Sequence, residues 1–156
     1  MLGILLALAA QASSDKLPPA QALPPPVGNE QPVLAAVNAL LETFGRGDSA
    51  AMLGLVHSDG RVTATGTRAT SSGLRSESWA QFASRITPDA SFQETISDPA
   101  VEVDGDAAMV WAPFVVRVAG KVSNCGIDHF DLVRDNGVWK VINLTFSSRV
   151  IGCSQQ

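Results

Sequence analysis

The sequence of 156 residues contains no tyrosine, only two cysteines and only two histidines. The missing tyrosine excludes any catalytic tyrosine, and so few cysteines and histidines exclude a disulfide-dense scaffold and a rich metal cluster. Charged residues make up only 17% of the chain, the formal net charge is −4 and no basic run occurs, which argues against a nucleic-acid-binding protein.

What is present is the composition of a globular protein, with 46% hydrophobic residues. The length fits one domain of ordinary size plus a short extension, and it suffices to bury a core.

The N-terminal segment predicts export. Residues 1–12 hold an apolar run too short to span a bilayer, followed by an Ala-x-Ala pattern typical of signal cleavage. No Lys or Arg precedes the run, so a disordered apolar tail is the alternative. Residues 13–31 are rich in proline and predict an extended tether. The folded domain is expected at 32–153, in an exported (periplasmic or secreted) protein without stable membrane insertion.

Helical spacing of apolar residues predicts a helix over 32–44 that ends at Gly45 or Gly47, and a second helix from 48 to about 57. A third helix is expected after Ser76 or Ser78, with Trp79 and Phe82 on its apolar face. Strands are expected at 61–67, 92–104 (bulged at Pro99), 107–118, 124–134 and 138–149, the last two joined by an Asn136–Gly137 turn. Helices followed by a meander of strands indicate an α+β fold.

Three segments make the chain resemble the nuclear transport factor 2-like superfamily, which has a cystatin-like cone fold: Phe44–Asp48, Val101–Ala108 and Phe130–Val141. Within it the chain looks most like SnoaL-like and putative lumazine-binding proteins, on Trp111–Phe114, Cys125–Gly126 and Arg149 with Cys153. The resemblance spans about 31–153. It implies N-terminal helices packed in a strongly curved, mainly antiparallel sheet, with an apolar pocket in the cone and dimerisation through the outer sheet face.

Two-residue turns let the faces of the sheet be assigned. A turn at Asn136–Gly137 sets Asp135 opposite Val138, and a turn at 119–120 then sets Trp111 opposite Asp128. The face that carries Trp139 is taken as inward, because that tryptophan packs the cone interior in proteins that this chain resembles. The expected ligand pocket combines residues of this inward face with two aromatic residues of the third helix and with Arg149 at the end of the last strand. Its residues are Trp79, Phe82, Met109, Trp111, Asp128, Phe130, Asn143, Thr145 and Arg149.

The opposite face is also apolar, whereas a solvated face should be polar. We therefore expect a second copy of the chain to cover it. The expected contact residues of this homodimer are Phe114, Ile127, His129, Ile142, Leu144 and Phe146.

Asp128 is the candidate catalytic residue, because an apolar wall would raise its pKa and suit it to proton transfer. A polar contact to a ligand and a structural hydrogen bond are the alternatives. The two histidines lie far apart in sequence and outside any ligand motif, so no metal site and no cofactor are expected.

The two cysteines predict one disulfide, Cys125–Cys153, as is usual in an exported protein. Cys153 overshoots the expected register by five residues, and Gly152 would let the tail hook back. Two buried thiols, or a reactive Cys125, are the alternatives.

Three functions fit these residues. The first is an exported protein that binds a small apolar molecule. The second is an isomerase, dehydratase or cyclase that uses Asp128 for proton transfer. The third is a protein-interaction module that docks through the outer face of the sheet.

Overall fold

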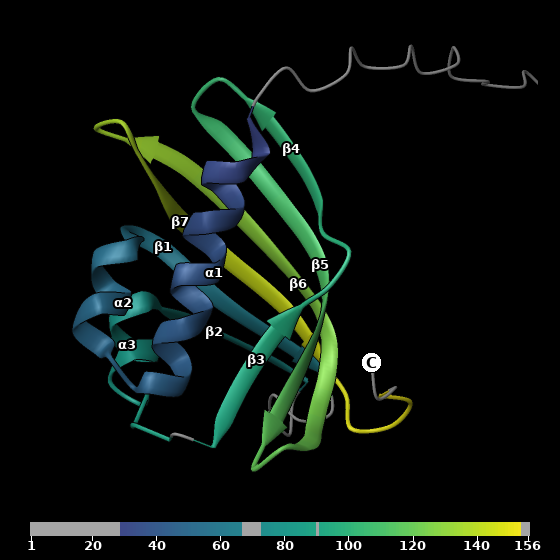
Figure 1. Ribbon diagram of the computed structural model, residues 1–156. Coiled ribbons are helices and arrows are strands. Elements are labelled where there is room, and N and C mark those ends of the chain that lie inside the picture. The colour runs from purple at the N-terminus through teal and green to yellow at the C-terminus, as the bar shows by residue number, and fades with distance from the viewer. Residues whose placement is uncertain (1–28, 67–72, 90, 154–156) are drawn as a thin grey trace, which may run out of the picture.

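The computed structural model describes residues 29–66, 73–89 and 91–153 (Figure 1). The predicted signal segment 1–12 and residues 13–28 of the predicted tether lie outside the described residues. The described part folds into helices that lie along one side of a curved sheet, which confirms the predicted α+β class. Its elements in chain order are α1 (Glu30–Arg46), α2 (Ser49–Leu55), β1 (Val56–Gly66), β2 (Leu74–Ser78), α3 (Trp79–Ala83), β3 (Phe92–Ile96), β4 (Ala100–Asp104), β5 (Ala107–Val118), β6 (Lys121–Asp135) and β7 (Val138–Ser148).

Each helix begins and ends where the local sequence provides a cap. The side chain of Asn29 accepts a hydrogen bond from the backbone N–H of Gln31, and Gly47 ends α1 with a φ of 62°, a conformation that glycine adopts without strain. Asp48 caps α2 in the same way. Ser78 and Gln81 form a capping box at α3, as the sequence allowed.

The sheet runs in the order β2-β1-β7-β6-β5-β3, and β4 also pairs with β5 beyond the end of β3. All pairs are antiparallel except β1 with β7. Figure 1 shows α1 crossing the concave side of the sheet, while α2 and α3 lie together at one end.

The strand predictions need three corrections. The expected single strand over 92–104 is two strands, β3 and β4, because the chain breaks at Ser97–Pro99, where Asp98 takes a φ of 43°. β1 begins at Val56, so it absorbs the end of the expected second helix and the expected turn at 58–60. The polar stretch before α3 contains β2, which pairs with β1.

Two β-bulges decide which side chains face inward. On β7, Leu132 pairs with Val141 but Asp131 pairs with Asn143, so Ile142 is the extra residue. On β6, Arg117 pairs with Val122 but Val116 pairs with Asn124, so Ser123 is extra. Each bulge reverses the faces of the residues beyond it.

The bulge at Ile142 is held by residues far away in the sequence. The indole Nε1 of Trp79 donates a hydrogen bond of 2.8 Å to the carbonyl oxygen of Ile142. Gly60 lies against the same carbonyl, where a Cβ atom would come within 1.6 Å of the oxygen. A side chain at position 60 would therefore displace β7 from its bulged position.

The core lies between the helices and the concave face of the sheet. Its largest fully buried side chains are Trp79, Phe130, Leu40, Met52 and Leu132. No helix among the described residues is long and apolar enough to cross a membrane.

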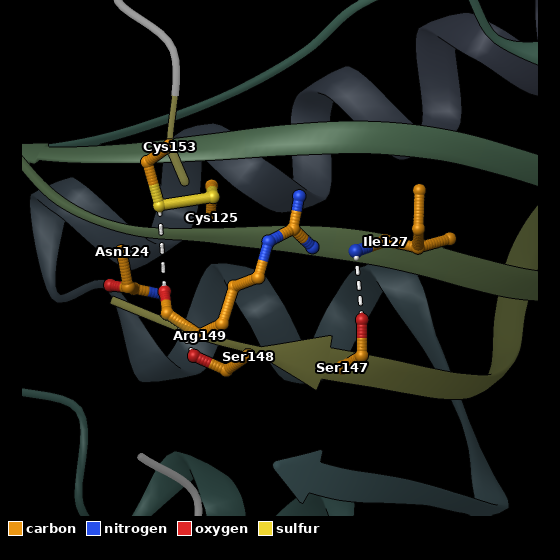
Figure 2. The surroundings of a disulfide bond; sticks show 7 residues. All are labelled: Asn124, Cys125, Ile127, Ser147, Ser148, Arg149 and Cys153. Carbon is orange, nitrogen blue, oxygen red and sulfur yellow. Dashed lines mark hydrogen bonds between the residues drawn. A yellow bond between two sulfur atoms is a disulfide. The ribbon is translucent and has the colours of Figure 1, made fainter. Parts of the chain in front are cut away.

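The predicted disulfide Cys125–Cys153 is present, with a Cα–Cα distance of 5.6 Å. Figure 2 shows the C-terminal tail folding back over β6 so that Cys153 reaches Cys125, beside Arg149. The backbone N–H of Cys125 donates to the carbonyl of Arg149 at 3.0 Å, and the reverse bond is 2.9 Å long. Closing a loop of 28 residues contributes about 3–4 kcal/mol in the chain-entropy description of cross-links.

Candidate functional site

A cavity of about 360 Å³ opens between the helices and the concave face of the sheet. Residues from α1, from α3 and the segment after it, and from β3, β5, β6 and β7 line it. They are Phe44, Phe82, Arg85, Ile86, Thr87, Asp89, Phe92, Glu94, Phe114, Val116, Asn124, Leu144 and Phe146. Most of this wall is apolar, which is typical of a small-molecule site.

Aromatic rings pack edge to face on two sides of the cavity. The rings of Phe44 and Phe82 are 5.5 Å apart, and those of Phe114 and Phe146 are 6.3 Å apart. This packing fixes the rings in place, so the cavity walls have a defined shape.

Glu94 on β3 lines this cavity, and behind it Asp128 on β6 contacts the Glu94 carboxyl. Glu94 is mostly buried and lines the cavity, while Asp128 is only 1% exposed. Burial raises the pKa of Glu94 to about 7, although its hydrogen bond with Asp128 acts in the opposite direction. Burial, then the charge of Glu94 and the hydrogen bond between the acids, raises the pKa of Asp128 well above 3.8. The pair therefore keeps a proton up to nearly neutral pH.

Arg85, the cation among the residues that line the cavity, is already engaged. Its guanidinium forms an ion pair with Glu77, and its Nε lies 3.3 Å from Oε2 of that residue. It also lies over the ring of Phe82, 5.6 Å from the ring centre. Arg85 thus closes one side of the cavity without neutralising the acid pair.

Some of the residues predicted for the pocket do lie inside the fold. Phe82 lines the cavity, and Asp128 lies beside Glu94. Trp79 and Phe130 are fully buried core residues rather than cavity walls.

Four of the predicted pocket residues lie on the convex face instead, so the predicted register is wrong there. Trp111 is 49% exposed and pairs with His129, whereas Ala112 pairs with Asp128. The cause is the pair of bulges, which the two turns alone could not reveal. The four residues are Met109, Trp111, Asn143 and Thr145.

The residues predicted for the dimer face lie on both sides of the sheet, and the two bulges are again the cause. Phe114, Leu144 and Phe146 line the internal cavity, so they are not available to a second copy. Ile142 is the bulged residue, and Ile127 and His129 do lie on the convex face.

Arg149 does not reach the cavity. It is exposed beyond the end of β7, beside the disulfide (Figure 2). The register that placed it inward ignored the bulge at Ile142, which displaces everything after it by one residue.

The sequence reasoning missed Glu94. The sequence feature that indicates Glu94 is the alternation of residues in β3, which puts Phe92, Glu94 and Ile96 on one face of the strand. A lone acid between two large apolar residues on the same face of a strand indicates a buried carboxyl. Within residues 29–66, 73–89 and 91–153, no three His, Cys, Asp or Glu side chains form a group that could hold a metal ion.

Solved structures share this fold at low sequence identity. A protein of unknown function from Nostoc punctiforme with a cystatin-like fold matches with a TM-score of 0.63 at 12% identity, covering 78% of this chain and 92% of that one. An NTF2-like protein from Cytophaga hutchinsonii matches with a TM-score of 0.63 at 15% identity, covering 78% of this chain and 99% of that one. The association domain of C. elegans CaMKII matches with a TM-score of 0.61 at 16% identity, covering 76% of this chain and 94% of that one.

At such identities these structures establish the fold alone. No curated protein matches the chain. At the sequence level, the SnoaL-like domain matches residues 32–145, which is most of the chain. The chain therefore belongs to the SnoaL-like family, with a fold shared by solved proteins described as NTF2-like.

Proposed function

We propose that this protein is exported and binds a small, mostly apolar molecule in the cavity between the helices and the sheet. The observation that carries the proposal is the cavity itself, about 360 Å³ with aromatic walls and one buried acid pair. Ligand sites typically combine such an apolar lining with a few polar groups that orient the ligand. Glu94 and Asp128 are those groups here.

Filling the cavity tests this function. Leu144 lines the cavity and is buried, whereas its neighbour Thr145 is exposed on the convex face. Leu144→Phe is expected to weaken binding of the neutral probe N-phenyl-1-naphthylamine about tenfold, because the added ring occupies space that the probe needs. Fluorescence titration measures the affinity.

The matched control is Thr145→Phe, which adds a ring on the opposite face and should leave the affinity unchanged. Circular dichroism checks that both variants fold. If Leu144→Phe does not fold, Thr87→Trp narrows the cavity from an exposed position. A wild type that fails to bind the probe, or equal effects of the two phenylalanines, would contradict the proposed function.

Catalysis is the second candidate function, favoured by the pKa of Glu94 near 7. A general acid or base works best when its pKa lies near the working pH. As an isomerase, dehydratase or cyclase, the protein would exchange a proton between Glu94 and its substrate, with Asp128 as the second proton carrier. Asp128→Asn should then abolish turnover of a compound that the cavity binds, and change its affinity only a few-fold. Unchanged turnover would reject this role for Asp128.

Association through the convex face is supported by exposed apolar surface. Trp111 on β5 packs beside His129 on β6, with ring centres 5.7 Å apart, and it remains half exposed. A second copy of the chain would cover this surface. The disulfide supports export, because such bonds persist in oxidising compartments. Native mass spectrometry of the secreted protein tests both, since a monomer with an uncleaved N-terminus would contradict them.

A further inference from the structure

We infer that the cavity selects an organic cation, an apolar molecule whose protonated amine binds at the Glu94 carboxyl. This inference rests on the proposed binding function and names the chemical class of its ligand.

The first argument is the missing hydrogen-bond donor at the acid pair. Both carboxyl oxygens of Asp128 are fully buried, and apart from the proton shared with Glu94 no donor among the described residues reaches either of them. The polar neighbour of Asp128 is another acid, Glu94. When the shared proton leaves, the buried acid pair is charged and has no donor, which costs free energy, and an ammonium group brings both a positive charge and N–H donors.

The second argument is the charge of the surrounding residues. Arg85 is held by Glu77, a carboxylate that Arg75 also contacts at 3.3 Å, and among the described residues no ion pair joins Arg85 to the acid pair. Asp89, also on the cavity wall, accepts hydrogen bonds from the side chain and backbone of Ser91, which lower its pKa and keep it ionised. The cavity therefore favours a cationic ligand over an anionic one.

The third argument is the aromatic wall. The faces of phenylalanine rings attract cations, most strongly where water is excluded. Phenylalanine rings reach the cavity from α1, α3, β3, β5 and β7, namely Phe44, Phe82, Phe92, Phe114 and Phe146. These rings suit both the apolar body of the ligand and the cation that it carries.

The pH dependence of binding follows from the same groups. Three charged or titratable groups lie near Glu94 at the cavity: Asp128 from β6, and Arg85 and Asp89 from the segment after α3. Glu94 also lines a second pocket between α1 and β3, where Glu42 from α1 is the other acid. Binding of an ammonium group should release the proton that the acid pair holds, because the cation favours the ionised carboxylate. Its affinity should therefore rise with pH until the Glu94 carboxyl has titrated.

Three probes with one carbon skeleton test the inference: 4-phenylbutylamine, 4-phenylbutan-1-ol and 4-phenylbutanoate. Isothermal titration calorimetry at pH 7.5 on the full-length oxidised protein is expected to show the amine binding about tenfold more tightly than the alcohol, and the carboxylate most weakly. Between pH 5.5 and 8 the affinity for the amine should rise about tenfold, while the affinity for the alcohol stays constant.

Glu94→Gln should abolish the preference for the amine and keep the affinity for the alcohol. The matched control is Glu102→Gln, an exposed acid on β4 that should retain the preference. Asp128→Asn is the second variant at the acid pair, in case Glu94→Gln does not fold, and it should weaken the preference as well.

Each outcome separates this inference from the proposed function. If the alcohol binds as tightly as the amine, or if Glu94→Gln and Asp128→Asn both keep the preference, the organic-cation class is wrong and the binding function stands. The same holds if none of the three compounds binds while N-phenyl-1-naphthylamine does. If that probe also fails to bind, the proposed function itself is wrong.

Discussion

Replacing Phe130 with alanine is expected to lower the free energy of unfolding by about 3–5 kcal/mol. Phe130 is fully buried in the core, paired with Val110 on β5 and Leu144 on β7. Removing its ring would leave a cavity that the surrounding strands cannot close, and the lost contacts add to the lost burial. Urea unfolding followed by circular dichroism measures the change.

The matched control is Trp111→Ala, which removes a larger ring from the convex face. Trp111 is 49% exposed, so the loss should stay below about 1 kcal/mol at protein concentrations where the chain is monomeric. A loss from Trp111→Ala as large as that from Phe130→Ala would contradict the bulged register and place Trp111 in the core. A loss that appears only at high concentration would instead support association through this face.

Raising the pH from below 4.5 to above 7 is expected to cost the wild type about 3 kcal/mol of stability relative to Glu94→Gln. The folded state raises the pKa of Glu94 from 4.5 to about 7, so folding favours the protonated acid. The contribution to stability is thus fully present below pH 4.5 and is lost as the pH rises through about 7. Asp128 acts in the same direction, because its pKa is raised as well.

Thermal or urea unfolding at a series of pH values measures this difference. Glutamine imitates the protonated acid at every pH, so the variant should lack the part of the loss that Glu94 contributes and keep the part that comes from burial of Asp128. Glu102→Gln is the control, since Glu102 is exposed on β4 and its replacement should leave the pH profile of the wild type unchanged. Parallel pH profiles for Glu94→Gln and the wild type would show that Glu94 is not held protonated by burial.

Predictions from the sequence are accurate close to the turns and become less so with distance from them. The Asn136–Gly137 turn fixes the pairs Asp135–Val138 and Arg134–Trp139, and both occur in the structure. The same register extended to Leu144 places that residue on the wrong face. A register counted from the turn assumes that no strand holds an extra residue, so the bulge at Ile142 puts every residue beyond it on the face opposite to the predicted one.

The contact between the two acids also cannot be predicted from local sequence. The apolar neighbours of Asp128 on its own strand predict a raised pKa, but its partner Glu94 lies 34 positions earlier on a strand that does not pair with β6. β3 and β6 both pair with β5, and the folded sheet brings the two carboxyls into contact. Their raised pKa values depend on that approach and on burial, and neither can be read from local sequence.

Local sequence predicts three helices, the hairpin turns at 119–120 and 136–137, the α+β class, the family resemblance and a disulfide between the two cysteines, but it misplaces the end of the second helix and predicts a turn at 58–60 that is part of β1. Helix caps, glycine turns and apolar spacing act over a few residues, so they can be read without a structure. The two bulges, the faces on which Trp111 and Leu144 lie, and the contact between Glu94 and Asp128 depend on long-range packing. The reason is physical, since the bulge at Ile142 depends on a hydrogen bond from Trp79, 63 residues away, and on the space left by Gly60.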